Sequence, residues 1–186
     1  VNSIYYDTND MLAYFEKIDG VGRRFKVRTR WYGEIFQGTD LSKLKIFVEI
    51  KHRNNDLIFK NRVKLPGNFL EGLCENQNHL TKLSQLVGND QVFEATTIQH
   101  LTSQKSLIPF CIVSYFRRPL LSRISPNLRV TFDTNLRAMG TQNIYQVSSD
   151  NGIYVLPPAL GIIEIKFHWA MPLWLIEICR EVGLNL

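Results

Sequence analysis

Side chains of opposite character alternate along most of this chain. Between residues 24 and 32, basic side chains occupy every second position and mostly apolar ones lie between them. Because successive side chains of a β-strand point to opposite faces, this period of two predicts a strand with one apolar and one basic face. The same alternation between turn residues predicts further strands over residues 3–7, 45–53, 57–65, 110–116, 127–133 and 161–169, with a weaker one near Tyr145.

Apolar residues recur at helical spacing in three other parts of the chain. A short helix is expected to end at Gly20, one helical run covers residues 69–86 and another residues 90–101, and a final helix starts at Pro172. The order of strands, helices, strands and helix is typical of an α+β fold. At 186 residues, the chain (1–186) has the length of a single domain.

The basic strand faces admit two interpretations. A half-solvated sheet with its polar side in water is the usual cause of alternation. These faces, however, consist mainly of Arg and Lys, whereas ordinary solvated faces mix charged and neutral polar residues. The helices also need apolar sheet faces to cover. We therefore predict a closed antiparallel β-barrel with helices packed outside it and the basic faces lining its interior.

A basic interior needs an anionic ligand, because unpaired buried charges are strongly destabilising. Arginine binds phosphate oxygens bidentately, and cations spread over many strands suit a polyanion better than a single phosphate. The net charge of +5 agrees with an anionic partner. Nucleic acid would need an exposed groove with stacking aromatic residues. The aromatic residues near the basic strands lie beside apolar faces and are expected in the core; they are Trp31, Tyr32, Tyr115 and Phe116.

Cysteine content and hydropathy exclude several other classes. Cys74, Cys111 and Cys179 are odd in number and far apart, so we expect neither a disulfide framework nor a zinc site, and a reducing compartment is favoured. No apolar stretch is long enough for a membrane span, and no signal peptide is visible. The chain begins with Val1 instead of methionine, so we expect it to be a piece of a longer protein.

Eight short motifs resemble those of the VTC domain, the polyphosphate polymerase module of the vacuolar transporter chaperone complex. They occur in the family's order over nearly the whole chain, and the ordered set is more specific than any one of them. The motifs are IYYDT (4–8), KVRTRWYG (26–33), FVEIKHR (47–53), KNR (60–62), SYFRRPL (114–120), LRVTFDTNL (128–136), IIEIKF (162–167) and PLW (172–174).

The resemblance implies a place among the triphosphate tunnel metalloenzymes (CYTH-like proteins), whose antiparallel barrel encloses a basic tunnel. It implies transfer of the γ-phosphoryl group of ATP onto a polyphosphate chain, with Mn²⁺ or Mg²⁺ as cofactor. ATP and polyphosphate or tripolyphosphate would be the partners, without nucleic acid. The domain would lie in the cytoplasm or at the cytoplasmic face of a membrane, with any anchor supplied by the parent protein or its complex.

The resemblance also implies roles for individual cations. Arg28 and Arg30 match the arginines of R-x-R-W-Y-G, Lys51 the lysine of V-E-x-K, Lys60 the lysine of K-x-R, Arg117 the arginine of Y-x-R, and Arg129 the arginine four residues before an aspartate. These six are the expected catalytic cations. Second-tier contacts are expected from other residues of the inward faces, namely Lys26, Glu49, Arg62 and Lys166. Arg118 is expected to point the other way.

Glu164 is the residue that the resemblance assigns to a metal ion. From the residues alone, a role as ion-pair partner of a neighbouring Arg or Lys is about equally well supported. The match to the family's metal-binding glutamate favours the metal, because a carboxylate among cations can hold a hard divalent ion that bridges phosphate oxygens.

The chain departs from the family pattern at both ends. The family usually begins with a further strand that carries a basic residue, and basic residues usually follow its last helix; neither feature is seen here. We therefore expect a single tunnel domain trimmed at both ends, whose activity as a fragment does not follow from the resemblance. Two alternatives stay open: a non-catalytic polyphosphate-binding or regulatory subunit, and a CYTH-type triphosphatase.

Overall fold

A computed structural model describes residues 1–75, 78–125, 127–140, 144–147 and 151–184. Within these residues, eight antiparallel strands form one sheet in the order β4-β3-β2-β1-β5-β6-β7, and β8 pairs with the part of β6 that β7 leaves free. The strands are β1 (Asn2–Asp7), β2 (Arg23–Trp31), β3 (Lys45–Asn54), β4 (Leu57–Pro66), β5 (Ile108–Leu121), β6 (Arg129–Met139), β7 (Ile153–Tyr154) and β8 (Gly161–Lys166).

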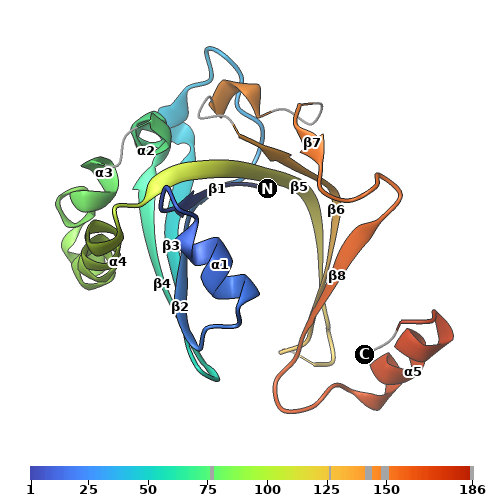
Figure 1. Cartoon of the computed structure of the whole chain (residues 1–186). Coiled ribbons are helices and arrows are strands. Elements are labelled where there is room, and N and C mark those ends of the chain that lie inside the picture. Colours follow the sequence, from blue (N-terminus) through green and yellow to red (C-terminus); the bar gives the residue numbers. More distant parts are fainter. Residues whose placement is uncertain (76–77, 126, 141–143, 148–150, 185–186) are drawn as a thin grey trace.

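The sheet curves strongly, so that β4 and β8 lie on opposite arms of an arch whose top is formed by β1 and β5 (Figure 1). The predicted antiparallel α+β architecture is therefore confirmed. Among the described residues, however, no ladder pairs β4 with β7 or β8, so the hydrogen-bonded sheet is open between its two arms. We call the inner side of the arch the concave face and the other side the outer face.

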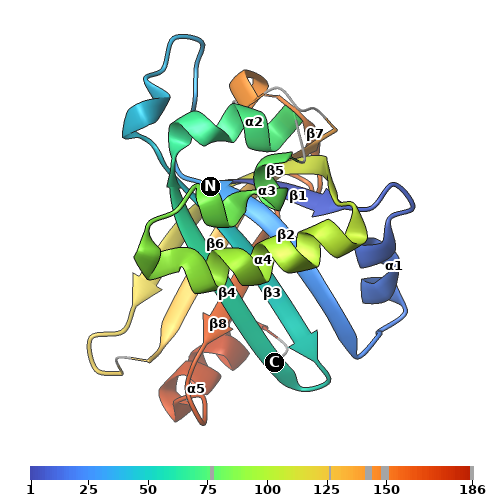
Figure 2. The ribbon, with the colours of Figure 1, turned by 90° about the vertical axis from the view of Figure 1, so that its left-hand side faces the viewer.

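Five α-helices accompany the sheet within the described residues: α1 (Leu12–Ile18), α2 (Leu70–Glu75), α3 (Asn78–Thr81), α4 (Val92–Lys105) and α5 (Leu173–Glu181). Figure 2 shows α2, α3 and α4 in front of the arm that contains β2, β3 and β4, on its outer face. Helix α1 connects β1 to β2, and α5 follows β8. None of these helices is long and apolar enough to cross a membrane.

Two expected elements differ from the structure. The predicted strand near Tyr145 is wrong, because Ile144–Gln146 forms a 3-10 helix and the extra strand at this sheet edge is β7. The helical run predicted over 69–86 is divided into short helices and 3-10 turns, whereas the run predicted over 90–101 is confirmed as α4, which begins at Val92. Apolar spacing marks which side of these segments is buried, but it does not specify where a helix is interrupted.

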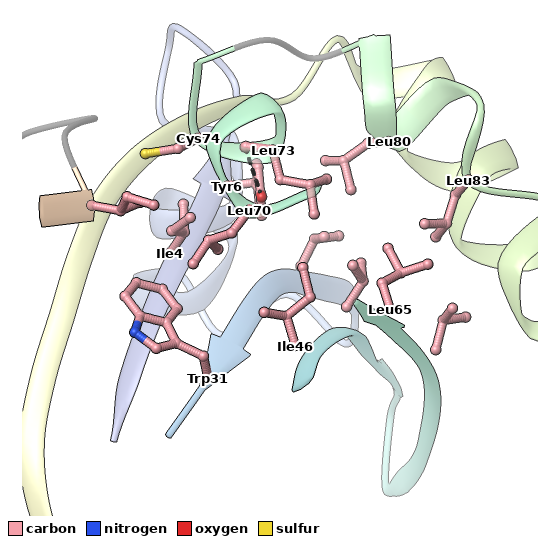
Figure 3. Close-up of a cluster of buried hydrophobic side chains, with 14 of the residues drawn as sticks. Ile4, Tyr6, Trp31, Ile46, Leu65, Leu70, Leu73, Cys74, Leu80 and Leu83 are labelled. Atoms are coloured by element: carbon pink, nitrogen blue, oxygen red, sulfur yellow. Dashed lines mark hydrogen bonds between the residues drawn. The ribbon is translucent and has the colours of Figure 1, made fainter. Parts of the chain in front are cut away.

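The main core lies between the outer face of β1–β4 and the short helices α2 and α3 (Figure 3). Ile4, Trp31 and Ile46 of the sheet meet Leu70 and Leu73 of α2, and all five are at most 1% exposed. Full burial of such side chains stabilises the fold by about 1.5–3 kcal/mol each. Because the apolar residues of β2–β4 are committed to this core, the alternate residues of the same strands must face the concave side.

Polar groups in this core are mostly hydrogen-bonded. The Tyr6 hydroxyl donates to the Leu73 carbonyl at 2.9 Å and lies 2.8 Å from the Thr29 hydroxyl, which ties β1 and β2 to α2. Cys74 and Cys179 are buried, and Cys111 is half-buried. Burial raises the pKa of Cys74 to about 12, so this thiol stays protonated and acts as a small apolar residue.

The outer face of the other arm is less covered. Leu175 and Cys179 of α5 pack with Leu128 and Ile165, beside the ends of β6 and β8. Apolar side chains elsewhere on β5, β7 and β8 remain exposed.

Candidate functional site

A buried carboxylate organises the concave face of β2, β3 and β4. Glu49 of β3 lies in register between Arg28 of β2 and Arg62 of β4. Its Oε2 accepts from Arg28 Nε at 2.7 Å and Nη2 at 2.6 Å, and its Oε1 accepts from Arg62 Nε at 2.6 Å and from Lys60 Nζ at 3.3 Å. The remaining Arg28 Nη1 donates to the Tyr5 hydroxyl at 3.3 Å. One carboxylate thus holds three of the cations expected to bind phosphate.

The charge state of Glu49 follows from these contacts. Its side chain is only 2% exposed, and burial alone would raise the pKa of its carboxyl group. The charges and hydrogen bonds of Arg28, Arg62 and Lys60 outweigh that effect and lower the pKa to about 2. Glu49 is therefore ionised throughout the physiological range and neutralises part of the cluster.

A row of three lysines crosses the same strands, two residues along each strand from the Glu49 cluster. Lys26 of β2, Lys51 of β3 and Lys60 of β4 are direct register partners. Like charges that lie opposite each other in a sheet are destabilising. Lys60 reaches Glu49, whereas Lys26 and Lys51 make no ion pair with any described residue. This row therefore carries a local excess of positive charge that an anion would relieve.

Tyr115 joins the two arms of the arch. Its hydroxyl accepts from Arg30 Nη2 at 3.2 Å, and the Arg117 guanidinium lies over its ring at 5.1 Å from the centroid. Arg30 is buried and also lies 3.4 Å from the Ser3 hydroxyl, so its described partners are neutral. Arg30 is therefore a buried basic residue without a described carboxylate partner. The expectation that Tyr115 belongs to the core is wrong, because its hydroxyl serves the concave face. The same expectation is wrong for Tyr32 and Phe116, which are exposed, and it is confirmed for Trp31.

Two carboxylates lie on the concave face of the second arm. Asp133 of β6 accepts from Arg117 Nε at 2.6 Å and from Nη2 at 2.5 Å. Glu164 of β8 accepts from Lys166 Nζ at 3.1 Å and lies 3.9 Å from Arg117 Nη2. Partial burial would raise the pKa of Glu164, but the hydrogen bond from Lys166 and the nearby guanidinium charges lower it below its ordinary value. Its side chain is 39% exposed and can reach a ligand.

The structure brings the expected site residues to one sheet. Arg129 is the register partner of Lys166 and makes no ion pair with a described residue. The strands and their alternation place all the expected cations and the metal candidate on the concave face: Lys26, Arg28, Arg30, Lys51, Lys60, Arg62, Arg117, Arg129, Glu164 and Lys166. Arg118, the neighbour of Arg117, is exposed and in register with Phe132 on the outer face, as expected.

The described residues only partly fit a divalent metal ion. They contain no group of three His, Cys, Asp or Glu side chains that could hold one. Glu164 is accessible, and Asp133 belongs to the same Arg117-centred group, but the Asp133 carboxylate is fully occupied by that arginine. Mg²⁺ commonly keeps several waters and binds through one or two carboxylates together with substrate phosphates. Glu164 therefore fits an ion shared with a phosphate chain, and not an ion in an all-protein cage.

Sequence reasoning assigned Glu49 a secondary contact and gave Tyr5, Tyr115 and Asp133 no role in the site. Each of these four holds a guanidinium on the concave face. Alternation places Asp133 on the face of Arg129, but it does not reveal which arginine Asp133 contacts.

Comparison with known proteins identifies the family. The model of the VTC domain matches residues 1–185. The chain is also 25% identical over 192 aligned residues to "Vacuolar transporter chaperone complex subunit 4" of Trypanosoma cruzi (strain CL Brener). That alignment covers 91% of this chain and 24% of the relative, so the chain spans about a quarter of the relative's length. With the basic concave face and a family match over almost its full length, the chain belongs to the VTC domain family.

Proposed function

We propose that the concave face binds a polyphosphate chain and that the domain transfers the γ-phosphoryl group of ATP onto it. The observation that carries this proposal is the set of concave-face cations without a described carboxylate partner: Lys26, Arg30, Lys51 and Arg129. They are spread over three strands on both arms, which suits a chain of phosphates better than one phosphate. Membership of a family linked to polyphosphate synthesis supports the same substrate class.

The proposed chemistry asks the protein mainly to position phosphates and to neutralise developing charge. Arg30 and Arg117, on either side of Tyr115, would hold neighbouring phosphates at the top of the arch. Glu49 would fix the orientation of Arg28. The N–H groups of the cluster that Glu49 does not engage would then bind phosphate oxygens. Such fixed donors cost little reorganisation when the phosphoryl group moves.

The proposed cofactor is Mn²⁺ or Mg²⁺, held by Glu164 together with phosphate oxygens. A bound divalent ion would supply charge neutralisation at the transferring phosphoryl group. Lys166 and Arg117 keep the Glu164 carboxylate ionised and oriented, so that it is ready to bind such an ion.

We also propose that the arch encloses its ligand as a triphosphate tunnel. The strong curvature of the sheet and the concentration of cations on its concave face support an enclosed path for the chain. Because the relative is named as a subunit of a complex, membership of a larger assembly at the cytoplasmic face of a membrane is part of the same proposal.

A second candidate function is polyphosphate binding without turnover. It is favoured by the carboxylates that already neutralise Arg28, Lys60 and Arg62 through Glu49, and Arg117 through Asp133. A site that retains its cations through internal ion pairs can bind an anionic chain without performing chemistry on it.

One experiment separates these functions. The full-length protein is incubated with ATP and Mn²⁺, and ADP, orthophosphate and chain length are followed over time. The polymerase proposal predicts release of ADP with matching growth of polyphosphate. Orthophosphate release from tripolyphosphate without chain growth would instead establish a triphosphatase. No turnover, combined with a tripolyphosphate-induced rise in melting temperature that weakens at high salt, would establish the binding function.

A further inference from the structure

A second basic surface lies on the outer face of the first arm, away from the phosphate site. Figure 2 shows α4 crossing β2, β3 and β4 part of the way along, so that the strands continue beyond it. A groove of about 740 Å³ lies here between α4, α1 and the strands. We call it the outer groove, and the residues that matter for its chemistry are Arg23, Phe25, Arg53, Phe59, Phe93 and Lys105.

Large apolar side chains line the outer groove. Phe25, His52 and Phe59 are register partners across β2, β3 and β4, and Phe93 of α4 faces them across the groove. Phe59 is 54% exposed and Phe93 is 76% exposed. Exposed aromatic rings on facing walls of one concavity offer apolar surface that a ligand can bury.

Positive charge surrounds this apolar floor. The lining of the outer groove contains four basic residues, Arg23, Arg24, Arg53 and Lys105. Its described lining also contains the acidic residue Glu16. None of the four cations makes an ion pair with a described residue. Their described hydrogen bonds go to neutral acceptors, as in Arg53 Nε to the Asn55 carbonyl at 2.6 Å. The groove therefore presents uncompensated positive charge around apolar rings.

The aromatic floor of the outer groove and Arg23 lie on the other side of the sheet from the proposed phosphate site, whereas Arg24 and Arg53 alternate with them and border both sides. Phe25, His52 and Phe59 alternate along their strands with Lys26, Lys51 and Lys60, which face the concave side. A polyphosphate chain would use the cations of the outer groove but would gain nothing from its phenylalanine rings. An anionic membrane would need apolar groups that protrude, whereas these line a hollow. The combination fits a protein segment that supplies both acidic and apolar side chains.

We propose that the outer groove docks an acidic segment of a protein partner, with large apolar side chains inserted between Phe59 and Phe93. Acidic side chains of the segment pair with Arg23 and Lys105 at the rim. Apolar anchors supply most of the affinity, and the charges supply the selection for an acidic sequence.

The test uses arrays of synthetic peptides in which net charge and the number of Phe and Leu residues vary independently. The wild-type chain should bind acidic peptides with apolar anchors roughly tenfold or more tightly than the same peptides with Glu replaced by Gln or Phe by Ser. Phe93→Ala, and separately Arg23→Glu combined with Lys105→Glu, should each reduce this binding roughly tenfold or more. Leu121→Ala and Arg123→Glu are matched controls on the β5–β6 hairpin, exposed and outside the groove, and should bind as the wild type does.

Two further measurements make the outcome decisive. Tripolyphosphate affinity should stay unchanged in the Phe93→Ala variant, which reports that the fold and the concave face are intact. Equal binding of acidic peptides with and without apolar anchors would overturn the proposal. A second result would also overturn it: the wild type binds vesicles that contain phosphatidylserine, Phe93→Ala abolishes that binding, and the peptides show no preference for acidic or apolar residues.

Discussion

The two arms of the arch hold their carboxylates differently. On the first arm, Glu49 is 2% exposed and contacts three cations at once. On the second arm, Glu164 is 39% exposed and accepts a hydrogen bond from Lys166, with Arg117 further away. The first carboxylate is part of the framework, and the second is available to a ligand.

This difference separates two uses of an acidic residue in a cationic site. A buried carboxylate keeps neighbouring arginines in place when no phosphate is bound, because unpaired charges in one place repel each other. An accessible carboxylate can instead take part in binding an ion that arrives with the substrate. Glu49 and Glu164 should therefore respond differently to the same chemical change, Glu→Gln.

The largest effect is expected for Glu49→Gln, on stability. Removing one partner of a buried ion pair costs about 3–5 kcal/mol, because the other charge is left uncompensated. Denaturant unfolding without ligand should show a loss of this size, and saturating tripolyphosphate should restore much of it by supplying the missing negative charge. Glu164→Gln is the control and should change the free energy of unfolding by less than about 1 kcal/mol. Equal losses for both variants would contradict the distinction.

Glu164→Gln should act on turnover. If Glu164 holds the divalent ion, ATP turnover by the full-length protein with Mn²⁺ should fall about 10²- to 10³-fold, as when a transition-state charge loses a fixed partner. Tripolyphosphate should bind as tightly or more tightly, because a negative charge has left a cationic site. Turnover at the normal rate would show that Glu164 is an ion-pair residue and that the metal binds elsewhere.

The sequence predicted one part of this comparison and missed another. Strict alternation on β2, β3 and β4 placed Arg28, Lys51 and Lys60 on the concave face, since a period of two determines the side of a strand. It could not show that Glu49 contacts three cations, because this depends on the register between strands and on side-chain reach across them. The same limit applies to Arg117 and Asp133, which meet through the pairing of β5 with β6.

Irregular features of the second arm were also beyond sequence reasoning. A register shift between β5 and β6 gives β6 an extra residue between Thr134 and Arg137, beside Asn135, which has a positive φ. Strand β5 was expected to end at Phe116 but continues to Leu121. The sequence also predicted a closed barrel, because the basic faces need to be enclosed. In the described residues, no strand pairing closes the sheet.

The link between the arms can be tested with Tyr115→Phe. This variant keeps the ring under Arg117 but removes the hydroxyl that accepts from Arg30. A hydrogen bond to a charged group contributes about 1.5 kcal/mol, so tripolyphosphate affinity should fall roughly tenfold. Tyr14→Phe, which changes an exposed ring on α1, is the control. Unchanged affinity for Tyr115→Phe would mean that the two arms bind phosphate independently.

The smallest effect concerns pH. A carboxyl group whose pKa is lower in the folded than in the unfolded state adds stability above its unfolded pKa, and this stability is lost as the pH falls toward the folded pKa. The pKa of Glu49 is about 2, against an ordinary value of 4.5, so most of this stability is lost as the pH falls from 4.5 to 2. At pH 4 the loss of stability is only about 1 kcal/mol. The stability difference between the wild type and Glu49→Gln should shrink by that amount from pH 7 to pH 4. A constant difference would indicate that Glu49 is not held by its cations.

Two arginines on opposite faces of the paired strands β5 and β6 allow the central claim to be tested most directly. Arg129 lies on the concave face without a described ion-pair partner, and Arg118 lies on the outer face, also without one. Calorimetric titration with tripolyphosphate would compare Arg129→Gln with Arg118→Gln, two substitutions that remove the same charge. We predict that Arg129→Gln weakens binding roughly tenfold or more, by loss of a charge-assisted contact, and that Arg118→Gln leaves it within about twofold of the wild type. Equal weakening by both variants would show that tripolyphosphate responds to net charge alone and would contradict a phosphate site on the concave face.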